Sequence, residues 1–307
     1  MEKSTLGLKI DVDTYRGLGD GVPRLMRILG RQGLRATFFI AMGPDNSGKA
    51  VWRFFTKKGF FKKMLRSNAV GMYGFRTALS GTLLPARQIA RSFPELFKEL
   101  IEYGHEVGIH GYDHVRWHDR LSSMTYCETE KEIGEACRIY RGIVGSAPQS
   151  SAAPGWTCTP HQLAIQDRMD MLYHSDSRGT APFFPTMGST SFEHLQIPTT
   201  LPTLDEILAQ GKLNTPSQLI AYYMDRITSS PSSVFTVHAE AEGIGWAEWL
   251  DDLINDLKSG GVSFMPLCEI ALSCLRKRDS IPRCELSMGN LPGRASPVAI
   301  QSKGVGT

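Results

Sequence analysis

The chain has 307 residues, of which 41% are hydrophobic and 21% charged, and its formal net charge is +3. This composition is typical of a globular protein and excludes a wholly disordered chain. No stretch offers the roughly 18 consecutive apolar residues of a membrane-spanning helix, and the N-terminus lacks the apolar core of a secretory signal. The six cysteines are spread without a C-x-x-C pair and indicate reduced thiols. We therefore expect a cytosolic protein, or one held peripherally on the cytosolic face of a membrane.

Predicted strands and helices alternate along most of the chain. In chain order they are strand 5–10, helix 19–33, strand 36–41, helix 89–104, strand 105–109, helix 125–144, strand 150–153, helix 160–168, helix 216–228, strand 233–237, helix 247–258 and strand 262–265. This alternation predicts a parallel sheet or barrel covered by helices. We expect one α/β domain over 1–277, with an insertion at about 44–88. The segment 278–307 is rich in Ser, Pro and Gly without a period, which predicts a disordered tail.

Acidic side chains close the first predicted strand. Asp11 and Asp13 are separated only by Val12, so in an extended chain both point to the same face. One carboxylate could then bind a metal while the other moves protons. The alternative is a helix cap or a solvated turn.

Two histidines follow the predicted strand 105–109. In H-G-Y-D-H, His110 and His114 are four residues apart, and on a helical turn such residues share one face. Two imidazoles and one carboxylate leave open positions on a metal, which suits a catalytic site. Gly111 stands where a zincin motif has its Glu base, so a zincin is excluded. Ordinary core or surface histidines remain the alternative.

His238 ends the predicted strand 233–237. In a closed parallel barrel, the C-terminal ends of all strands meet at one mouth, so His238 would join Asp11, Asp13 and His110 there. A structural histidine is the alternative. Two more segments at predicted strand ends, 150–156 and 172–179, could form the wall of a pocket. A role as ordinary connecting loops is the alternative for each.

The motifs I-D-V-D, H-x-x-x-H, A-P-G-W, H-S-D-S and T-V-H together resemble the polysaccharide deacetylase (NodB-homology) family. The resemblance covers about residues 5–270. It implies a distorted (β/α)7 barrel that holds one divalent metal ion, which could be Zn, Mn, Co or Ni. The long insertion after the second strand is similar to that of members which act on lipid-linked formamido sugars.

The resemblance also implies a role for each motif residue. Asp13, His110 and His114 would bind the metal, Asp11 would be the general base, His238 the general acid, and Asp176 the residue that orients His238. Substrate contacts would come from Pro154, Gly155, Trp156 and Arg178.

This chain departs from the family pattern in two places. Gly111 replaces the usual Ser or Thr after the first metal histidine, so a hydrogen bond that fixes the loop is lost. Ala152 stands where the family often has an Arg that holds the base. Arg178 is a candidate substitute for that Arg.

A basic segment lies inside the insertion. Between residues 46 and 94 there are ten Lys and Arg and no Asp or Glu, so the rest of the chain is net acidic. Within 51–66, helical spacing groups apolar side chains apart from basic ones, as in two short amphipathic helices that meet at Gly59. We expect Trp52, Phe54, Phe55, Phe60, Phe61, Lys62 and Lys63 to bind an anionic membrane surface. A solvated basic helix packed on the barrel is the alternative, and nucleic acid is not expected because no nucleic-acid motif accompanies the segment.

The resemblance therefore implies a metal-dependent amide hydrolase. It would remove the formyl group from undecaprenyl-phosphate-linked 4-deoxy-4-formamido-L-arabinose, a step of lipid A modification and of resistance to cationic antimicrobial peptides such as polymyxin. A family deacetylase acting on N-acetyl sugars and an inactive membrane-associated scaffold are the alternatives.

Overall fold

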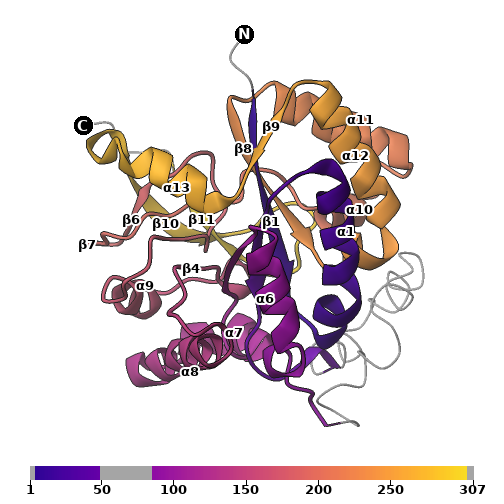
Figure 1. Ribbon diagram of the computed structural model, residues 1–307. Coiled ribbons are helices and arrows are strands. Elements are labelled where there is room, and N and C mark those ends of the chain that lie inside the picture. Colours follow the sequence, from indigo (N-terminus) through magenta and orange to yellow (C-terminus); the bar gives the residue numbers. More distant parts are fainter. Residues whose placement is uncertain (1–3, 49–84, 303–307) are drawn as a thin grey trace.

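A curled parallel sheet forms the centre of the protein in the computed structural model, which describes residues 4–48 and 85–302 (Figure 1). Its strands are β1 (Thr5–Val12), β2 (Thr37–Ile40), β3 (Glu106–Ile109), β4 (Ser150–Ser151), β5 (Tyr173–His174), β8 (Ser232–His238) and β9 (Ser263–Met265). They are ordered β5-β4-β3-β2-β1-β8, and β9 pairs with the first residues of β1. All these pairs are parallel, as the alternation of strands and helices predicts.

The segment 195–201 closes the gap between β5 and β8. On one side, the His174 N–H donates to Leu195 O at 2.8 Å and the Ile197 N–H donates to His174 O at 2.8 Å. On the other side, the Thr200 N–H donates to Val234 O at 3.1 Å. The curled sheet thereby becomes a ring, and the predicted distorted barrel is confirmed.

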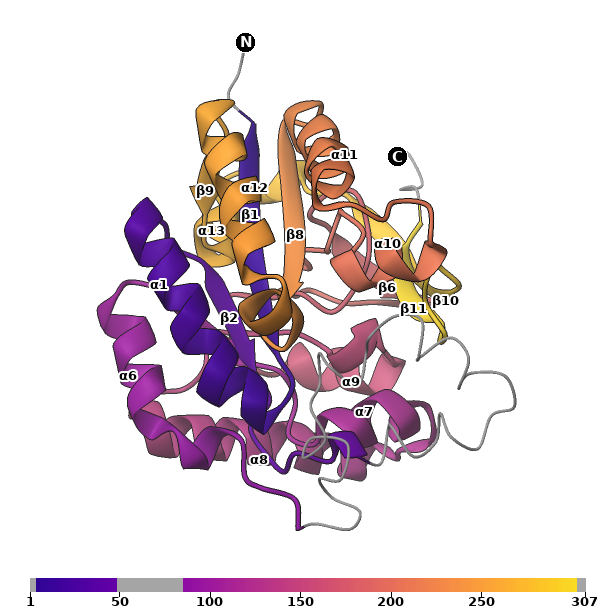
Figure 2. The ribbon, with the colours of Figure 1, turned by 90° about the vertical axis from the view of Figure 1, so that its right-hand side faces the viewer.

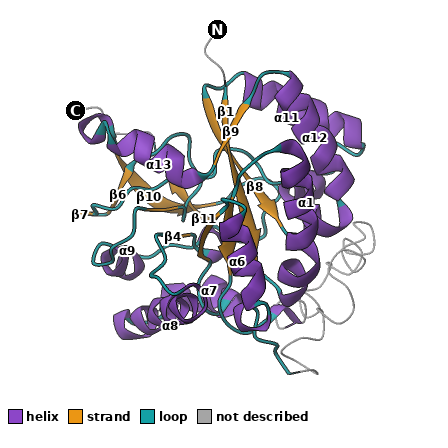
Figure 3. Cartoon of the chain, viewed as in Figure 1, coloured by secondary structure: helices purple, strands orange, loops and turns teal. Residues whose placement is uncertain are grey.

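Helices cover the outside of this ring (Figures 2 and 3). They are α1 (Val22–Gln32), α6 (Pro94–Glu102), α7 (His114–Arg120), α8 (Tyr126–Val144), α9 (Pro160–Gln166), α10 (Leu204–Gln210), α11 (Pro216–Thr228), α12 (Ala247–Ser259) and α13 (Leu267–Leu275). Local signals set their ends: α8 begins with a capping box between Thr125 and Glu128 and ends at Gly145 in the left-handed conformation. The predicted helix 89–104 is broken at Phe93, because Pro94 cannot continue a helix from the preceding turn.

Both faces of β1 are buried, but they differ in character. Leu6, Leu8 and Ile10 belong to the apolar core shared with α1 and α12. Because side chains alternate along a strand, Lys9 and Asp11 point the other way, into the ring. Both are almost fully buried, with 0% and 3% of their surface exposed. The fold thus places two charged side chains inside the barrel.

A second, four-stranded sheet packs beside the barrel, on the side away from α1 and α12 (Figure 1). It consists of β6 (Phe184–Met187), β7 (Thr190–Ser191), β10 (Arg283–Gly289) and β11 (Val298–Gln301). The expectation of a disordered tail is therefore wrong for residues 278–302. The physical reason is burial: Leu286 and Ala299 pack with Phe183 and Phe192 in one apolar cluster.

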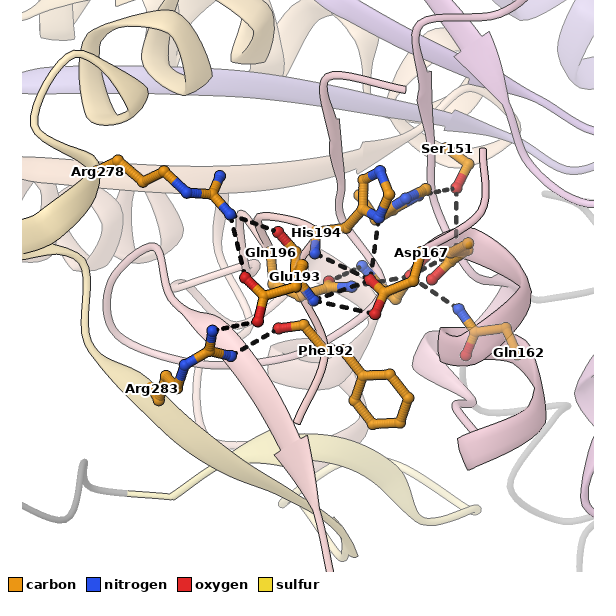
Figure 4. Close-up of polar contacts among 12 residues, drawn as sticks. Ser151, Gln162, Asp167, Phe192, Glu193, His194, Gln196, Arg278 and Arg283 are labelled. Atoms are coloured by element: carbon orange, nitrogen blue, oxygen red, sulfur yellow. Dashed lines mark hydrogen bonds and ion pairs between the residues drawn. The ribbon is translucent and has the colours of Figure 1, made fainter. Parts of the chain in front are cut away.

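Polar contacts fasten the same sheet to the rest of the chain (Figure 4). Arg283 donates to Phe192 O at 2.9 Å and forms an ion pair with Glu193, to which Arg278 also donates. The neighbouring His194 is held by the Asp167 carboxylate, with 3.0 Å between Nδ1 and Oδ1. The C-terminal segment is thus tied to the barrel by both apolar and charged contacts.

The ends of the predicted insertion meet beside β2. Pro44 and Gln88 form an isolated antiparallel bridge, and the Asp45 N–H donates to Arg87 O at 2.8 Å. The side chains predicted to bind a membrane lie outside the described residues; they are Trp52, Phe54, Phe55, Phe60, Phe61, Lys62 and Lys63. Among the residues that are described, no helix is both long and apolar enough to cross a bilayer.

Candidate active site

The three predicted metal ligands meet at the C-terminal mouth of the barrel. Asp13 follows β1, His110 follows β3, and His114 is the first residue of α7. The distance from Asp13 Oδ1 to His110 Nε2 is 3.3 Å, and that from Asp13 Oδ2 to His114 Nε2 is 3.4 Å. One ligand atom from each of the three residues lies within 4.8 Å of the others. This arrangement can hold one metal ion.

The two histidines do not share a helical turn, which corrects the expectation from their spacing. His110 lies in the loop, and the chain turns at Gly111, whose φ of +69° favours glycine. A Cβ there would also lie 3.1 Å from Pro154. Asp113 then caps α7 by accepting a hydrogen bond from the Arg116 N–H, which fixes His114 in the first turn.

Gly111 has no side chain that could hold this loop by a hydrogen bond. Backbone hydrogen bonds hold the loop instead. The Met42 N–H donates to Gly111 O at 3.1 Å, and the Gly43 N–H donates to Tyr112 O at 2.8 Å. The loop after β3 is thus held by the loop after β2.

The donor set fits a divalent cation. His110 Nδ1 lies 2.9 Å from Ala152 O, so its proton is on Nδ1 and the Nε2 lone pair faces the site. Asp13 Oδ1 is buried without a hydrogen-bond partner. Burial favours a protonated Asp13, but the charges of His114, His110 and His238 outweigh it and hold the pKa of Asp13 well below its usual range. Two imidazoles and a carboxylate leave open positions, as catalytic metal sites require.

Asp11 and His238 are direct neighbours across β1 and β8, where their Cα positions are paired in the register. Burial lowers the pKa of His238, but the nearby charges of Asp205, Asp13, Glu242 and Asp11 raise it to about 9. Asp205, at the start of α10, is 3.8 Å from His238 Nδ1. His238 therefore carries a proton at neutral pH, as a general acid must.

Lys9 supplies the buried cation beside Asp11. Its Nζ is 3.4 Å from Asp11 Oδ2 and donates to Ser175 O at 3.1 Å. Arg178 does not take this place, because it donates to Glu206 Oε1 at 2.5 Å and to Leu201 O at 2.7 Å. The hypothesis that Arg178 substitutes for the arginine that the family often has at the position of Ala152 is therefore not supported. Lys9 is two residues before Asp11, so the two side chains share one face of β1. This spacing is the sequence signal from which the role of Lys9 could have been predicted.

Asp176 is buried and hydrogen-bonded away from His238. Its Oδ2 accepts from Gln162 at 2.9 Å, from Gln166 at 2.9 Å and from Gln196 at 3.1 Å. Burial raises the pKa of Asp176. The carboxylate that pairs with the imidazole ring of His238 is Asp205 instead. The motif that contains His238 did not indicate Asp205, because α10 lies in another part of the chain.

The predicted substrate segment forms one wall near His238. Pro154, Gly155 and Trp156 make a short 3-10 turn, and the Trp156 ring meets the His238 ring edge-on with 6.3 Å between centroids. Trp156 has a φ of +52°, a strained conformation for a residue with a side chain. Its indole N–H donates to Thr199 Oγ1 at 3.1 Å. These contacts hold a bulky ring beside the candidate acid.

Glu240 fixes the loop that carries Asp13. Its Oε1 accepts from the Asp13 N–H at 2.9 Å and from the Thr14 N–H at 2.8 Å. Burial and the charge of Asp13 raise the pKa of Glu240 to about 8. Sequence reasoning missed this residue, although it lies two positions after His238.

Comparison with known proteins now defines the class. Residues 2–173 match the family model described as polysaccharide deacetylase, and the chain belongs to this family. It is 37% identical, over 86% of its length and 85% of the relative's, to a Shewanella sediminis protein named as a probable 4-deoxy-4-formamido-L-arabinose-phosphoundecaprenol deformylase, ArnD. A Wigglesworthia glossinidia brevipalpis protein with the same name is 30% identical, over 92% of this chain and 97% of the relative.

Solved structures share the fold. A Mycobacterium smegmatis protein described as a polysaccharide deacetylase superposes with a TM-score of 0.64 at 18% identity, over 95% of this chain and 96% of that one. A pseudoenzyme from Bacillus anthracis superposes with a TM-score of 0.52 at 18% identity, over 88% and 66% of the two chains. Since the fold also occurs in a pseudoenzyme, catalysis has to be argued from the side chains of the site.

Proposed function

We propose that this protein is a metal-dependent deformylase that hydrolyses the formamide of 4-deoxy-4-formamido-L-arabinose linked to undecaprenyl phosphate. The products are formate and the free 4-amino sugar. The observation that carries the proposal is the convergence of Asp13, His110 and His114 beside the pair Asp11 and His238 at one mouth. The two relatives named as formamido-arabinose deformylases support the choice of substrate.

The residues divide the chemistry between them. A divalent ion, held by Asp13, His110 and His114, would polarise the formamide carbonyl and acidify a water molecule. Asp11 accepts a proton from the attacking water, and the neighbouring Lys9 forms an ion pair with that carboxylate. His238 donates its proton to the amine nitrogen as the C–N bond breaks. Without this proton the leaving group would be an amide anion, which is expelled poorly.

The insertion is proposed to bring this mouth to the membrane. The lipid-linked substrate remains in the bilayer, so the site has to face it. The described ends of the insertion, at Asp45 and Arg87, are joined beside β2 on the same side as the metal ligands: the Tyr15 N–H donates to Asp45 Oδ2 at 3.0 Å, and Asn46 donates to Asp113 at 2.7 Å. The basic and aromatic residues in the sequence of the insertion favour binding to the anionic cytoplasmic leaflet of the inner membrane.

Formate release tests the proposed reaction. Metal-loaded protein in detergent is incubated with undecaprenyl-phosphate-linked 4-formamido-arabinose, and an Asp13→Ala variant serves as the control. We expect formate from the wild type and none from the variant. Acetate from the N-acetyl analogue without formate from the formamide would replace the proposal with a deacetylase. No product from either substrate would favour an inactive scaffold.

A further inference from the structure

Two arginines from distant parts of the chain converge on Trp156. The Arg178 guanidinium lies 4.9 Å from the ring centroid and that of Arg294 lies 4.7 Å from it. Arg178 follows β5, whereas Arg294 belongs to the loop between β10 and β11. This loop was expected to be disordered, so a position near the site could not be predicted for Arg294.

Close packing explains why the loop delivers Arg294 to this position. Gly293 has a φ of +88°, and a Cβ on it would lie 2.2 Å from Glu206 O, in the first turn of α10. Only glycine allows this approach of the loop to α10. Arg294 directly follows Gly293 and is positioned by this approach, and 15% of its side chain is exposed.

The cluster carries more positive than negative charge. Both guanidinium groups share one carboxylate, since Glu206 Oε1 lies 2.5 Å from Arg178 Nη1 and 3.4 Å from Arg294 Nη1. Lys9, which is 5.4 Å from the same ring, is already paired with Asp11. In the described part of the chain, Nε of Arg178 and Nε of Arg294 are both buried without a hydrogen-bond partner. An excess cation with unused donors fits an anionic ligand.

The cluster also lies one aromatic ring away from the candidate acid. Trp156 contacts Arg294 through its ring and meets the His238 ring edge-on. The adjacent residues Asp205 and Glu206 contact His238 and the arginine pair respectively. The formamide and the phosphate of the proposed substrate are attached at opposite ends of one sugar ring. A phosphate site is therefore needed about one ring away from the site of hydrolysis.

We propose that Arg294, with Arg178 beside it, binds the phosphate that links the sugar to its lipid. This inference rests on the proposed deformylase function and names the residues that read the anionic part of that substrate. A planar guanidinium matches two phosphate oxygens, which a lysine cannot do. The site thus selects a phosphate-linked sugar over a neutral glycoside of the same formamido sugar.

The test compares two substrates and two variants. Metal-loaded wild type, Arg294→Gln and Arg283→Gln are assayed for formate from the undecaprenyl-phosphate-linked sugar and from the methyl glycoside of the same sugar. Arg283 lies on β10 and contacts Glu193 instead of Trp156, so it controls for weakening of the C-terminal sheet. We expect Arg294→Gln to raise KM for the phosphate-linked substrate about tenfold or more, with kcat nearly unchanged. Its kcat/KM for the methyl glycoside should equal that of the wild type.

Other outcomes would overturn the inference. Equal losses on both substrates, or the same loss in Arg283→Gln, would mean that Arg294 has only a structural role. An Arg294→Gln variant that matches the wild type on both substrates would exclude it from phosphate binding. Should the wild type hydrolyse neither substrate, the proposed function fails, and calorimetric titration with dodecyl phosphate still decides this inference. Dodecyl phosphate binding that is equal in wild type and Arg294→Gln would then overturn it, and weaker binding in the variant would support it.

Discussion

Lys9 and Asp11 lie two residues apart on β1 and form an ion pair inside the barrel, with 3.4 Å between Nζ and Oδ2. Burial lowers the pKa of Lys9, while the charges of Asp11 and Asp176 oppose that change. The pair explains how this chain holds its candidate base with Ala152 in place of an arginine. It also makes Lys9 the first residue to test.

Replacing Lys9 should damage both activity and stability. Lys9→Met leaves Asp11 buried without a cation, and breaking a buried pair costs about 3–5 kcal/mol in free energy of unfolding. We also expect kcat to fall by about 10²-fold or more, because general bases contribute about 10²–10⁴-fold. Formate release and thermal unfolding measure the two effects. Lys9→Arg should restore part of the activity, and Lys212→Met, at an exposed position, is the matched control. Full activity in Lys9→Met would remove Lys9 from the mechanism.

The contact between Asp205 and His238 predicts a pH dependence. The negative charges that face His238 are Asp205 on α10, Asp13 in the loop after β1, Glu242 in the turn after β8, and Asp11 on β1 itself. Because its pKa is raised to about 9, His238 keeps its proton below that pH and loses it as the pH rises further. Asp205→Asn removes one raising charge, so the alkaline limb of kcat/KM should move to lower pH. An unmoved limb would show that Asp205 does not set the charge of His238.

Metal binding should depend on the three proposed ligands. We expect His110→Ala and Asp13→Ala to lose bound metal and activity together, since each removes one of the three proposed ligands. His161→Ala, at an exposed histidine, should keep both. Elemental analysis of purified protein measures the metal without relying on activity. Equal metal content in His110→Ala and the wild type would rule out this site.

The C-terminal sheet should contribute measurably to stability. Leu286 on β10 is 1% exposed, whereas Met288 on the same strand is 45% exposed. Leu286→Ala should lower the free energy of unfolding by about 2–5 kcal/mol, because it leaves a cavity in the core. Met288→Ala should change it by no more than about 0.5 kcal/mol. Denaturant unfolding measures both, and equal small effects would mean that the sheet is not packed as described.

The insertion gives a prediction about membrane binding. Phe60→Ser combined with Phe61→Ser should reduce sedimentation with anionic vesicles, because apolar surface that would enter the bilayer is lost. Hydrolysis of a short-chain soluble analogue should be unchanged. Tyr103→Ser is the control, since Tyr103 is 69% exposed and follows α6 at the opposite end of the strands. Unchanged sedimentation of the double variant would argue against a membrane-binding insertion.

The sequence by itself determined the alternation of strands and helices, local helix ends such as the capping box and the glycine stop of α8, and the proposed metal ligands that meet at the mouth. These features are local: capping residues, glycine stops and alternating apolar positions act within a few residues of each other. Parallel strands also bring their C-terminal ends to one edge, so Asp13, His110 and His238 could be expected to converge before any contact was known.

Only the tertiary structure decided which charges are partners. Lys9 and not Arg178 contacts Asp11, and Asp205 and not Asp176 contacts His238. Arg294 reaches Trp156 because the segment expected to be disordered buries its apolar side chains against the barrel. Such contacts join residues that are distant in the chain, and their free energy depends on burial and on neighbouring charges that no local pattern encodes.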